Sequence, residues 1–184
     1  DLIVNTSLEI LVREAEKNYS CIARGLITGI NSDGERKNLA KEHLLHDSYM
    51  ADVRWSENES LWFYWYFTAC LFKNDFLKEN FIVFPEGVRN EDPVFLCRAF
   101  LAAKKISLIP EIVYLYNVDP NMNKKNRDIN FFQAWAQMNL YIYQFIQNHE
   151  KQANRFILGL SNIEQNIRDL VRCAKKEESI YIIK

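Results

Sequence analysis

The spacing of hydrophobic and polar residues along the chain predicts an alternation of helices and strands. Apolar residues near the start recur at helical intervals, at Leu8, Leu11, Val12 and Ala15. Thr6 and Glu9 have the spacing of a capping box, so we expect a helix over residues 6–18. The following "CIARGLITGI" is rich in β-branched residues and leads into the turn sequence "NSDG", which favours a strand and a hairpin. A helix followed by a strand indicates an α/β protein.

The middle of the chain alternates a polar excursion with the most apolar segments. The stretch "KEHLLHDSYMADVRWSENES", residues 41–60, is polar and irregular, which is typical of a long surface loop bordering a binding site. The aromatic "LWFYWYFTACLF" predicts a buried segment that ends near Phe72, and "DFLKEN" then predicts a short helix.

A second helix-start signal follows the loop sequence "PEGVRN". Asp92 is a favoured N-cap residue, Pro93 suits the first helical position, and "VFLCRAFLAAKK" continues as a helix. Beyond it, "ISLIPEIVYLYNV" predicts two short strands separated at Pro110, because proline has no N–H for strand pairing.

The last third of the chain has a helical pattern. One helix is predicted by an apolar stripe at Phe131, Phe132, Trp135, Met138, Tyr141, Ile142 and Phe145. "NIEQNIRDLVRCAKK" has similar spacing, and the final "SIYIIK" fits either a short strand or a frayed end. We therefore divide the chain into an α/β unit, residues 1–120, and a helical tail, residues 121–184. Packing of the tail on the rest of the chain is the default, and a dimer or a membrane surface is the alternative.

Composition narrows the classes of function. A chain of 184 residues with 48% hydrophobic residues can bury a substantial core. A net charge of −1 gives no basic field for phosphate backbones, so we expect no nucleic-acid partner. The four cysteines are scattered, which fits a reducing compartment. The sequence has neither a span of about 18 uncharged residues nor a signal-peptide pattern, which favours a cytoplasmic protein that at most contacts the inner face of a membrane.

The stretch "NDFLKENFIVFPEGVRNEDPVFLCRAFLAAKKISLIPEIVYLYN", residues 74–117, has a distinctive order of motifs. It contains a short helix, a loop with the F-x-E pattern, an acidic Glu-Asp pair, an apolar helix and a "KI..IPE..Y.Y" segment. This order resembles the second half of family 2 glycosyltransferases, the GT-A type enzymes that use nucleotide sugars. "DLIVNTSLEILVREAEKN" resembles the segment after that family's metal-binding Asp-x-Asp motif, so the resemblance covers about residues 1–118.

The resemblance implies a fold, an activity and a missing part. The fold would be an incomplete GT-A type mixed sheet with flanking helices, and the family's nucleotide-binding first half is not among these 184 residues. The bacterial-type parent would move a sugar from a nucleotide sugar to a glycan or lipid-linked acceptor, with inversion at the anomeric carbon. A divalent ion, Mn²⁺ or Mg²⁺, would assist, and most of its ligands would come from the missing half. We expect these 184 residues alone to have little or no activity.

Two acids carry the chemistry that the resemblance implies. Asp92 would be the general base that takes the proton of the acceptor hydroxyl, and Glu91 would hold the acceptor or orient its partner. The residues alone favour a plainer role for Asp92, that of an N-cap. The positive end of the helix dipole also lowers the basicity of a carboxylate there unless burial offsets the effect. If Asp92 is a general base that also caps the helix, both interpretations hold.

Further site candidates are weaker. Trp55, in a polar stretch, could stack on an acceptor sugar, and Arg89 is a second acceptor-binding candidate, able like Arg98 to pair with the acids or with a diphosphate. Asp1 is the candidate metal ligand, as the last acid of the metal-binding cluster. His43 and His46 have ligand spacing in "HLLHD", but a solvated helical face is the favoured interpretation because no third ligand is evident nearby.

A function from another class stays open beside the enzyme. A non-catalytic interaction or oligomerisation module derived from a glycosyltransferase fold would also contain these motifs, and the helical tail would then recruit a partner or build a homodimer.

Overall fold

The computed structural model describes residues 1–39, 42–62, 64–87, 91–118 and 129–147. The strands among them are β1 Leu2–Ile3, β2 Ile22–Ile30, β3 Arg36–Lys37, β4 Met50–Val53, β5 Cys70–Phe72 and β6 Ile106–Asn117. The helices are α1 Ser7–Lys17, α2 Asn74–Glu79, α3 Asp92–Ala102 and α4 Ile129–Ile146. Single 3₁₀ turns occur at Glu42–Leu44, Glu59–Trp62 and Phe67–Ala69.

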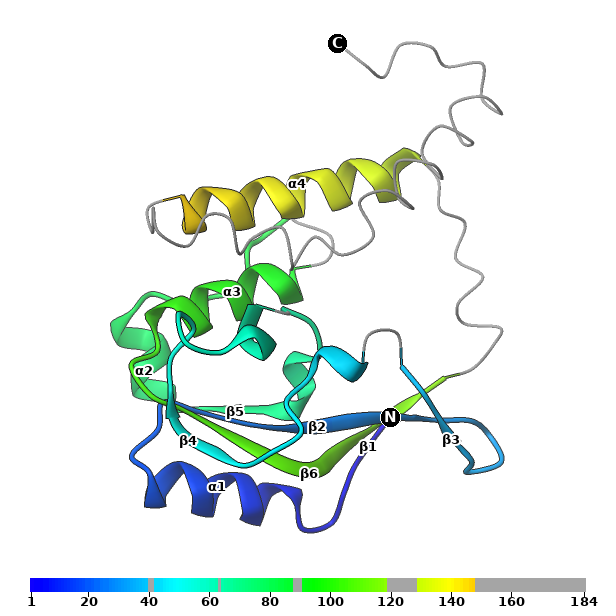
Figure 1. Cartoon of the computed structure of the whole chain (residues 1–184). Coiled ribbons are helices and arrows are strands. Elements are labelled where there is room, and N and C mark those ends of the chain that lie inside the picture. Colours follow the sequence, from blue (N-terminus) through cyan, green and yellow to red (C-terminus); the bar gives the residue numbers. More distant parts are fainter. Residues whose placement is uncertain (40–41, 63, 88–90, 119–128, 148–184) are drawn as a thin grey trace.

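The described strands form one six-stranded mixed sheet with a parallel pair at its centre (Figure 1). β2 and β6 run parallel, and β6 also pairs antiparallel with β1 and β4. β2 pairs antiparallel with β3 and β5, and its pairing with β3 confirms the hairpin expected at "NSDG". Two strands that pair in parallel require a long crossover, and here the segment from β3 to α3 supplies it.

β6 corrects one prediction, because it is a single strand of 12 residues and not two strands separated at Pro110. The proline has a local effect instead. Arg24 pairs with Leu108 whereas Leu26 pairs with Ile112, so β6 accommodates extra residues around Pro110 as a bulge-like irregularity. The missing N–H interrupts the ladder without ending the strand.

Gly25 lies opposite this irregularity and allows the two strands to approach. A Cβ atom built on Gly25 would lie 2.5 Å from Cγ1 of Val113 and 3.1 Å from the carbonyl oxygen of Glu111. Any larger residue would therefore have to push β6 away from β2.

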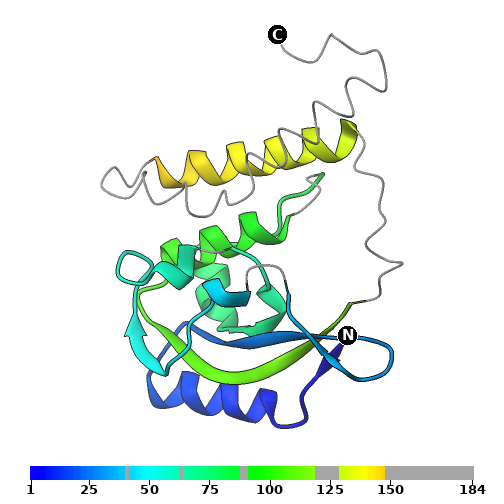
Figure 2. The same ribbon diagram turned by 45° about the vertical axis from the view of Figure 1, so that its right-hand side comes forward.

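Helices cover both faces of the sheet, α1 on one and α3 and α4 on the other (Figures 1 and 2). α1 confirms the first predicted helix, but not its predicted contact face. Leu11 is buried, whereas Leu8 and Val12 are 58% and 41% exposed. The buried face instead includes two polar residues, Ser7 and Glu14. The capping box is also wrong, since the N-cap residue Thr6 makes no side-chain capping hydrogen bond.

The opposite layer contains most of the core. Seven of the eleven residues of α3 are buried, in keeping with its apolar sequence, and Met138, Ile142 and Ile146 of α4 join the same hydrophobic cluster. The predicted stripe of α4 thus packs within the chain, and this helix shares a core with the α/β unit. The second tail helix and "SIYIIK" lie outside the described residues. Among the helices that the structure describes, none is long and apolar enough to cross a membrane.

Candidate functional site

The acidic pair lies at the beginning of α3. α3 starts at Asp92, so Glu91 is the N-cap residue and Pro93 occupies the second helical position, one place later than the sequence predicted. The Glu91 side chain makes no capping hydrogen bond, and only its carbonyl oxygen accepts the first helical bond, from the amide of Phe95 at 3.0 Å. The cap role predicted for Asp92 is therefore wrong.

The Asp92 carboxylate is half-buried and makes no hydrogen bond or ion pair to another described residue. Burial raises the pKa of Asp92 above its usual range, and the neighbouring Glu91 carboxylate raises it further by charge repulsion. These effects oppose the helix dipole, which stabilises a negative charge at this end. The carboxylate is thus both unengaged and more basic than that of an ordinary aspartate.

The direction of α3 places this carboxylate at a favourable end of the sheet. α3 runs opposite to β2 and β6, so its first turn points toward the carboxyl ends of the parallel strands (Figures 1 and 2). Open α/β sheets bind their ligands outside the carboxyl ends of parallel strands. The start of α3 therefore faces the side toward which the parallel strands run.

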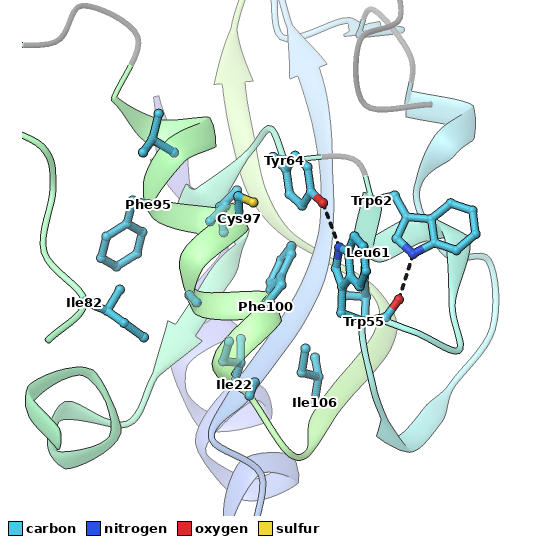
Figure 3. Packing of buried hydrophobic residues seen from close by; sticks show 14 of the residues in the cluster. Ile22, Trp55, Leu61, Trp62, Tyr64, Ile82, Phe95, Cys97, Phe100 and Ile106 are labelled. Atoms are coloured by element: carbon cyan, nitrogen blue, oxygen red, sulfur yellow. Dashed lines mark hydrogen bonds between the residues drawn. The ribbon is translucent and has the colours of Figure 1, made fainter. Parts of the chain in front are cut away.

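Trp55 does not have the exposure that sugar stacking requires. It is 3% exposed, and its indole Nε1 donates a hydrogen bond to the Tyr64 hydroxyl at 2.7 Å (Figure 3). Its carbonyl oxygen accepts a hydrogen bond from Nε1 of Trp62, also at 2.7 Å. This burial contradicts the acceptor-binding role expected of Trp55. The core role expected of Trp62 is confirmed, because it is 6% exposed.

Of the two candidate arginines, the structure describes only Arg98. Arg98 pairs with neither acid, since its guanidinium donates to the carbonyl oxygens of Phe81 and Val83 and lies over the Phe145 ring of α4. It therefore ties α3 to the turn after α2 and to α4. Arg89 lies outside the described residues.

No group of three or more His, Cys, Asp or Glu residues that could hold a metal ion occurs in the described part of the chain. The Asp1 carboxylate accepts hydrogen bonds from the Asn117 amide at 2.8 Å and the Tyr114 hydroxyl at 3.2 Å. These contacts fix Asp1 at the end of β6. As a metal ligand it would need partners from outside the described residues, so this role stays a prediction.

His46 is not on a solvated face. It is 5% exposed, and its Nε2 lies 2.9 Å from the carbonyl oxygen of Ile109. Burial lowers the pKa of His46 to about 4, so the ring is neutral at physiological pH and Nε2 donates to the carbonyl. The side chain of His43 lies outside what the structure describes.

Arg24 is an important residue that sequence reasoning missed. It is fully buried in β2, and its guanidinium donates to the carbonyl oxygens of Ser60 at 3.0 Å and Trp65 at 3.2 Å. It also lies 5.2 Å from the centre of the Phe100 ring. Arg24 thereby holds the aromatic segment against α3. The only signal was a lone arginine inside the apolar strand sequence "CIARGLITGI".

Comparison with known proteins places this geometry in a known fold. No protein-family model matches the chain. Over 108 residues it is 36% identical to a poly(ribitol-phosphate) beta-glucosyltransferase of Bacillus spizizenii, a match covering 56% of this chain and 15% of that protein. The crystal structure of S. aureus TarS 1–349 is similar with a TM-score of 0.59 and 16% identity, covering 99% of this chain and 48% of that one. The chain has a glycosyltransferase fold.

A second TarS structure, in complex with UDP-GlcNAc, gives a TM-score of 0.57 at 17% identity and covers 95% of this chain and 53% of that one. The expected fold class, part of a GT-A type mixed sheet with flanking helices, is thus confirmed. The chain spans about half the length of TarS 1–349 and a smaller share of the curated glucosyltransferase.

Proposed function

We propose that this chain forms the acceptor-side part of an inverting glycosyltransferase that uses a uridine diphosphate sugar. Similarity to a glucosyltransferase supports sugar transfer, and TarS in complex with UDP-GlcNAc and with UDP supports a nucleotide-sugar donor. The acceptor is a glycan or lipid-linked polymer, of which poly(ribitol phosphate) is the first to test because the curated relative is named for it.

The observation that carries the proposal is the state of Asp92. Its carboxylate is half-buried, its pKa is raised, and no described residue engages it, although it begins a helix. A general base needs a pKa nearer to the working pH than that of an ordinary aspartate, and it needs oxygen atoms that a substrate can reach. The direction of the pKa shift and the partial exposure of the Asp92 carboxylate support this role.

In the proposed step, Asp92 takes the proton of an acceptor hydroxyl as that oxygen attacks the anomeric carbon from the face opposite the diphosphate. The new bond between the acceptor oxygen and the anomeric carbon forms while the bond to the diphosphate breaks. The leaving group departs as UDP with the bonding electron pair. A single displacement of this kind inverts the anomeric configuration, and Glu91 would hold the acceptor beside the base.

The donor site lies largely outside the described residues under this proposal. A divalent ion would stabilise the negative charge of the leaving diphosphate, and Asp1 is the residue of this chain that we propose to contact it. The proposal therefore refers to the chain joined to its nucleotide-binding part, and we expect the 184 residues alone to be inactive.

The test uses the upstream-extended protein with a panel of UDP-sugars, Mn²⁺ and poly(ribitol phosphate), with UDP release and polymer glycosylation as readouts. Asp92→Asn removes the base while keeping the shape of the side chain. We expect kcat to fall by about 10² or more, the usual contribution of a general base. Asp75→Asn is the matched control, because Asp75 is an exposed acid in the first turn of α2, and its kcat should stay at the wild-type value.

Two results would contradict the proposal. Equal activity of folded Asp92→Asn and wild type would exclude Asp92 as the base. Absence of activity in the wild type with every donor would favour the non-catalytic interaction module. Against an assembly role for the described tail helix, α4 already buries apolar residues such as Met138 and Ile142 against its own chain.

A further inference from the structure

A polar groove of about 440 Å³ lies between the loop that precedes α3 and one face of α4. Its polar lining consists of Glu86, Asn130, Gln133, Gln137 and Tyr141. Asn130, Gln133 and Gln137 recur at helical spacing beside the apolar stripe of α4. Tyr141 belongs to both sets, because it lines the groove and also packs against the core.

The lining has the chemistry of a site for neutral, hydroxyl-rich groups. Each amide offers a donor and an acceptor side by side, and a sugar or polyol hydroxyl can both donate and accept. Glu86 adds an acceptor, and Tyr141 adds a hydroxyl and a ring.

The loop side of the groove is fixed to α3. The Phe84 ring stacks on Phe95 of α3 with 4.2 Å between ring centres and an interplanar angle of 7°. Arg98 of α3 binds the carbonyl oxygen of Phe81 at 2.8 Å. Glu86 therefore follows a segment with two anchors on α3.

The helix side is fixed to α3 as well. The Arg98 guanidinium lies 5.1 Å from the centre of the Phe145 ring, and Met138 and Ile142 are buried in the core. α3 and α4 run in the same direction, so their first turns point to the same end of the molecule (Figures 1 and 2).

Chain length bounds the distance from the groove to the base. Gly87, which also lines the groove, precedes Glu91 by four positions. An extended chain spans at most about 3.5 Å per residue, so the α-carbons of these residues lie within about 14 Å. A polymer with its reacting hydroxyl at Asp92 would have a neighbouring unit within reach of the groove.

We propose that this groove binds a neutral polyol or sugar unit of the acceptor polymer next to the unit that is glycosylated. The assignment rests on the proposed function, and it makes α4 a determinant of acceptor specificity. Gln133 and Gln137 hold the hydroxyls of that unit, and neither takes part in the transfer step.

The test uses the upstream-extended protein and the double variant Gln133→Leu/Gln137→Leu, which removes both amides at similar volume. The control is Gln144→Leu, an exposed residue of the same helix that does not line the groove. For poly(ribitol phosphate), we expect KM to rise about tenfold in the double variant, because two lost hydrogen bonds weaken binding by that order. The KM for the UDP-sugar and its hydrolysis without acceptor should match those of the wild type.

Calorimetric titration with poly(ribitol phosphate) separates this inference from the proposed function. Weaker binding by the double variant than by Gln144→Leu supports the groove even if no sugar is transferred. Equal binding and equal acceptor KM in the two variants overturn the groove while leaving Asp92 as the base. If the wild type neither binds the polymer nor transfers sugar to it, the groove is overturned together with the proposed acceptor.

Discussion

The first residues of α1 and α3 have similar sequence signals, but their polar side chains make different contacts in the structure. Each helix begins beside a residue that commonly caps helices, Thr6 in one case and Asp92 in the other, and neither side chain forms the expected cap. At α1 the polar group that matters is Ser7, which is buried and donates a hydrogen bond to the carbonyl oxygen of Val113 at 2.7 Å. At α3 the Asp92 carboxylate is left available. A polar group at the start of α1 is thus bound to the sheet, whereas no described residue binds the Asp92 carboxylate at the start of α3.

The largest predicted effect on stability concerns His46, a buried polar residue that contacts β6. Its Nε2 bonds to the carbonyl oxygen of Ile109, and Ile109 belongs to the same hydrophobic cluster as Leu11 of α1. The pKa of His46 is lowered from 6.5 to about 4 in the folded chain, so the unfolded chain binds a proton more readily between these values. Stability should therefore fall as the pH decreases from 6.5 to 4. The loss reaches about 3 kcal/mol, because each pKa unit is worth about 1.36 kcal/mol.

Urea denaturation of wild type and His46→Gln at several pH values measures this effect. The glutamine amide can donate to the Ile109 carbonyl oxygen but does not titrate, so the variant should show a flatter dependence between pH 6.5 and 4. The same slope in both proteins would show that His46 does not control acid stability. The charges that act on it are Arg24, which lowers the pKa, and Asp47, which raises it.

The second prediction concerns the stability contributed by the polar residues at the start of α1. Ser7→Ala removes a buried hydrogen bond and leaves the Val113 carbonyl oxygen without that donor, so the free energy of unfolding should fall by about 1 to 3 kcal/mol. Thr6→Ala is the control, because its side chain makes no capping bond, and it should stay within about 0.5 kcal/mol of the wild type. A larger loss for Thr6→Ala than for Ser7→Ala would restore the capping box predicted from the sequence.

The smallest predicted effect on stability concerns Asp92, and its dependence on pH is opposite to that of His46. The raised pKa of Asp92 means that the folded chain binds its proton more tightly than the unfolded chain, so this group contributes stability below pH 3.8 and loses it as the pH rises through the folded pKa. At pH 7 the charged carboxylate is a cost that Asp92→Asn removes. The variant should show a slightly higher denaturation midpoint than the wild type at pH 7, with the difference gone near pH 3.5. A lower midpoint at pH 7 would mean that the carboxylate has a stabilising partner.

Local sequence signals correctly predicted the elements that depend only on residues close together in the sequence. The β2–β3 hairpin follows from "NSDG", α2 from "DFLKEN", and the buried stripe of α4 from its spacing. The acidic pair was found by its order among neighbouring motifs, and the structure places both acids at the start of one helix.

The failures involve contacts between distant parts of the chain. Trp55 occurs in a polar stretch, but Tyr64 and Trp62 enclose it. Val12 belongs to an apolar helical face, yet the sheet packs on the face that contains Ser7, whose hydroxyl donates a hydrogen bond to the Val113 carbonyl oxygen of β6. No pattern within a window of ten residues contains that information. The raised pKa of Asp92 likewise depends on burial that only the folded chain provides.

The position of β6 sets the order in which this chain can fold during synthesis. β6 pairs with β1, β2 and β4, all of which are made earlier, and with no strand made later among the described residues. Residues 1–105 therefore leave the ribosome before the strand that joins them, and the partners of β2 among the described strands made by then are β3 and β5. Pairings between residues far apart in sequence form slowly, and exposed strand edges favour aggregation meanwhile. The described sheet can therefore be completed only once residues 106–117 have emerged.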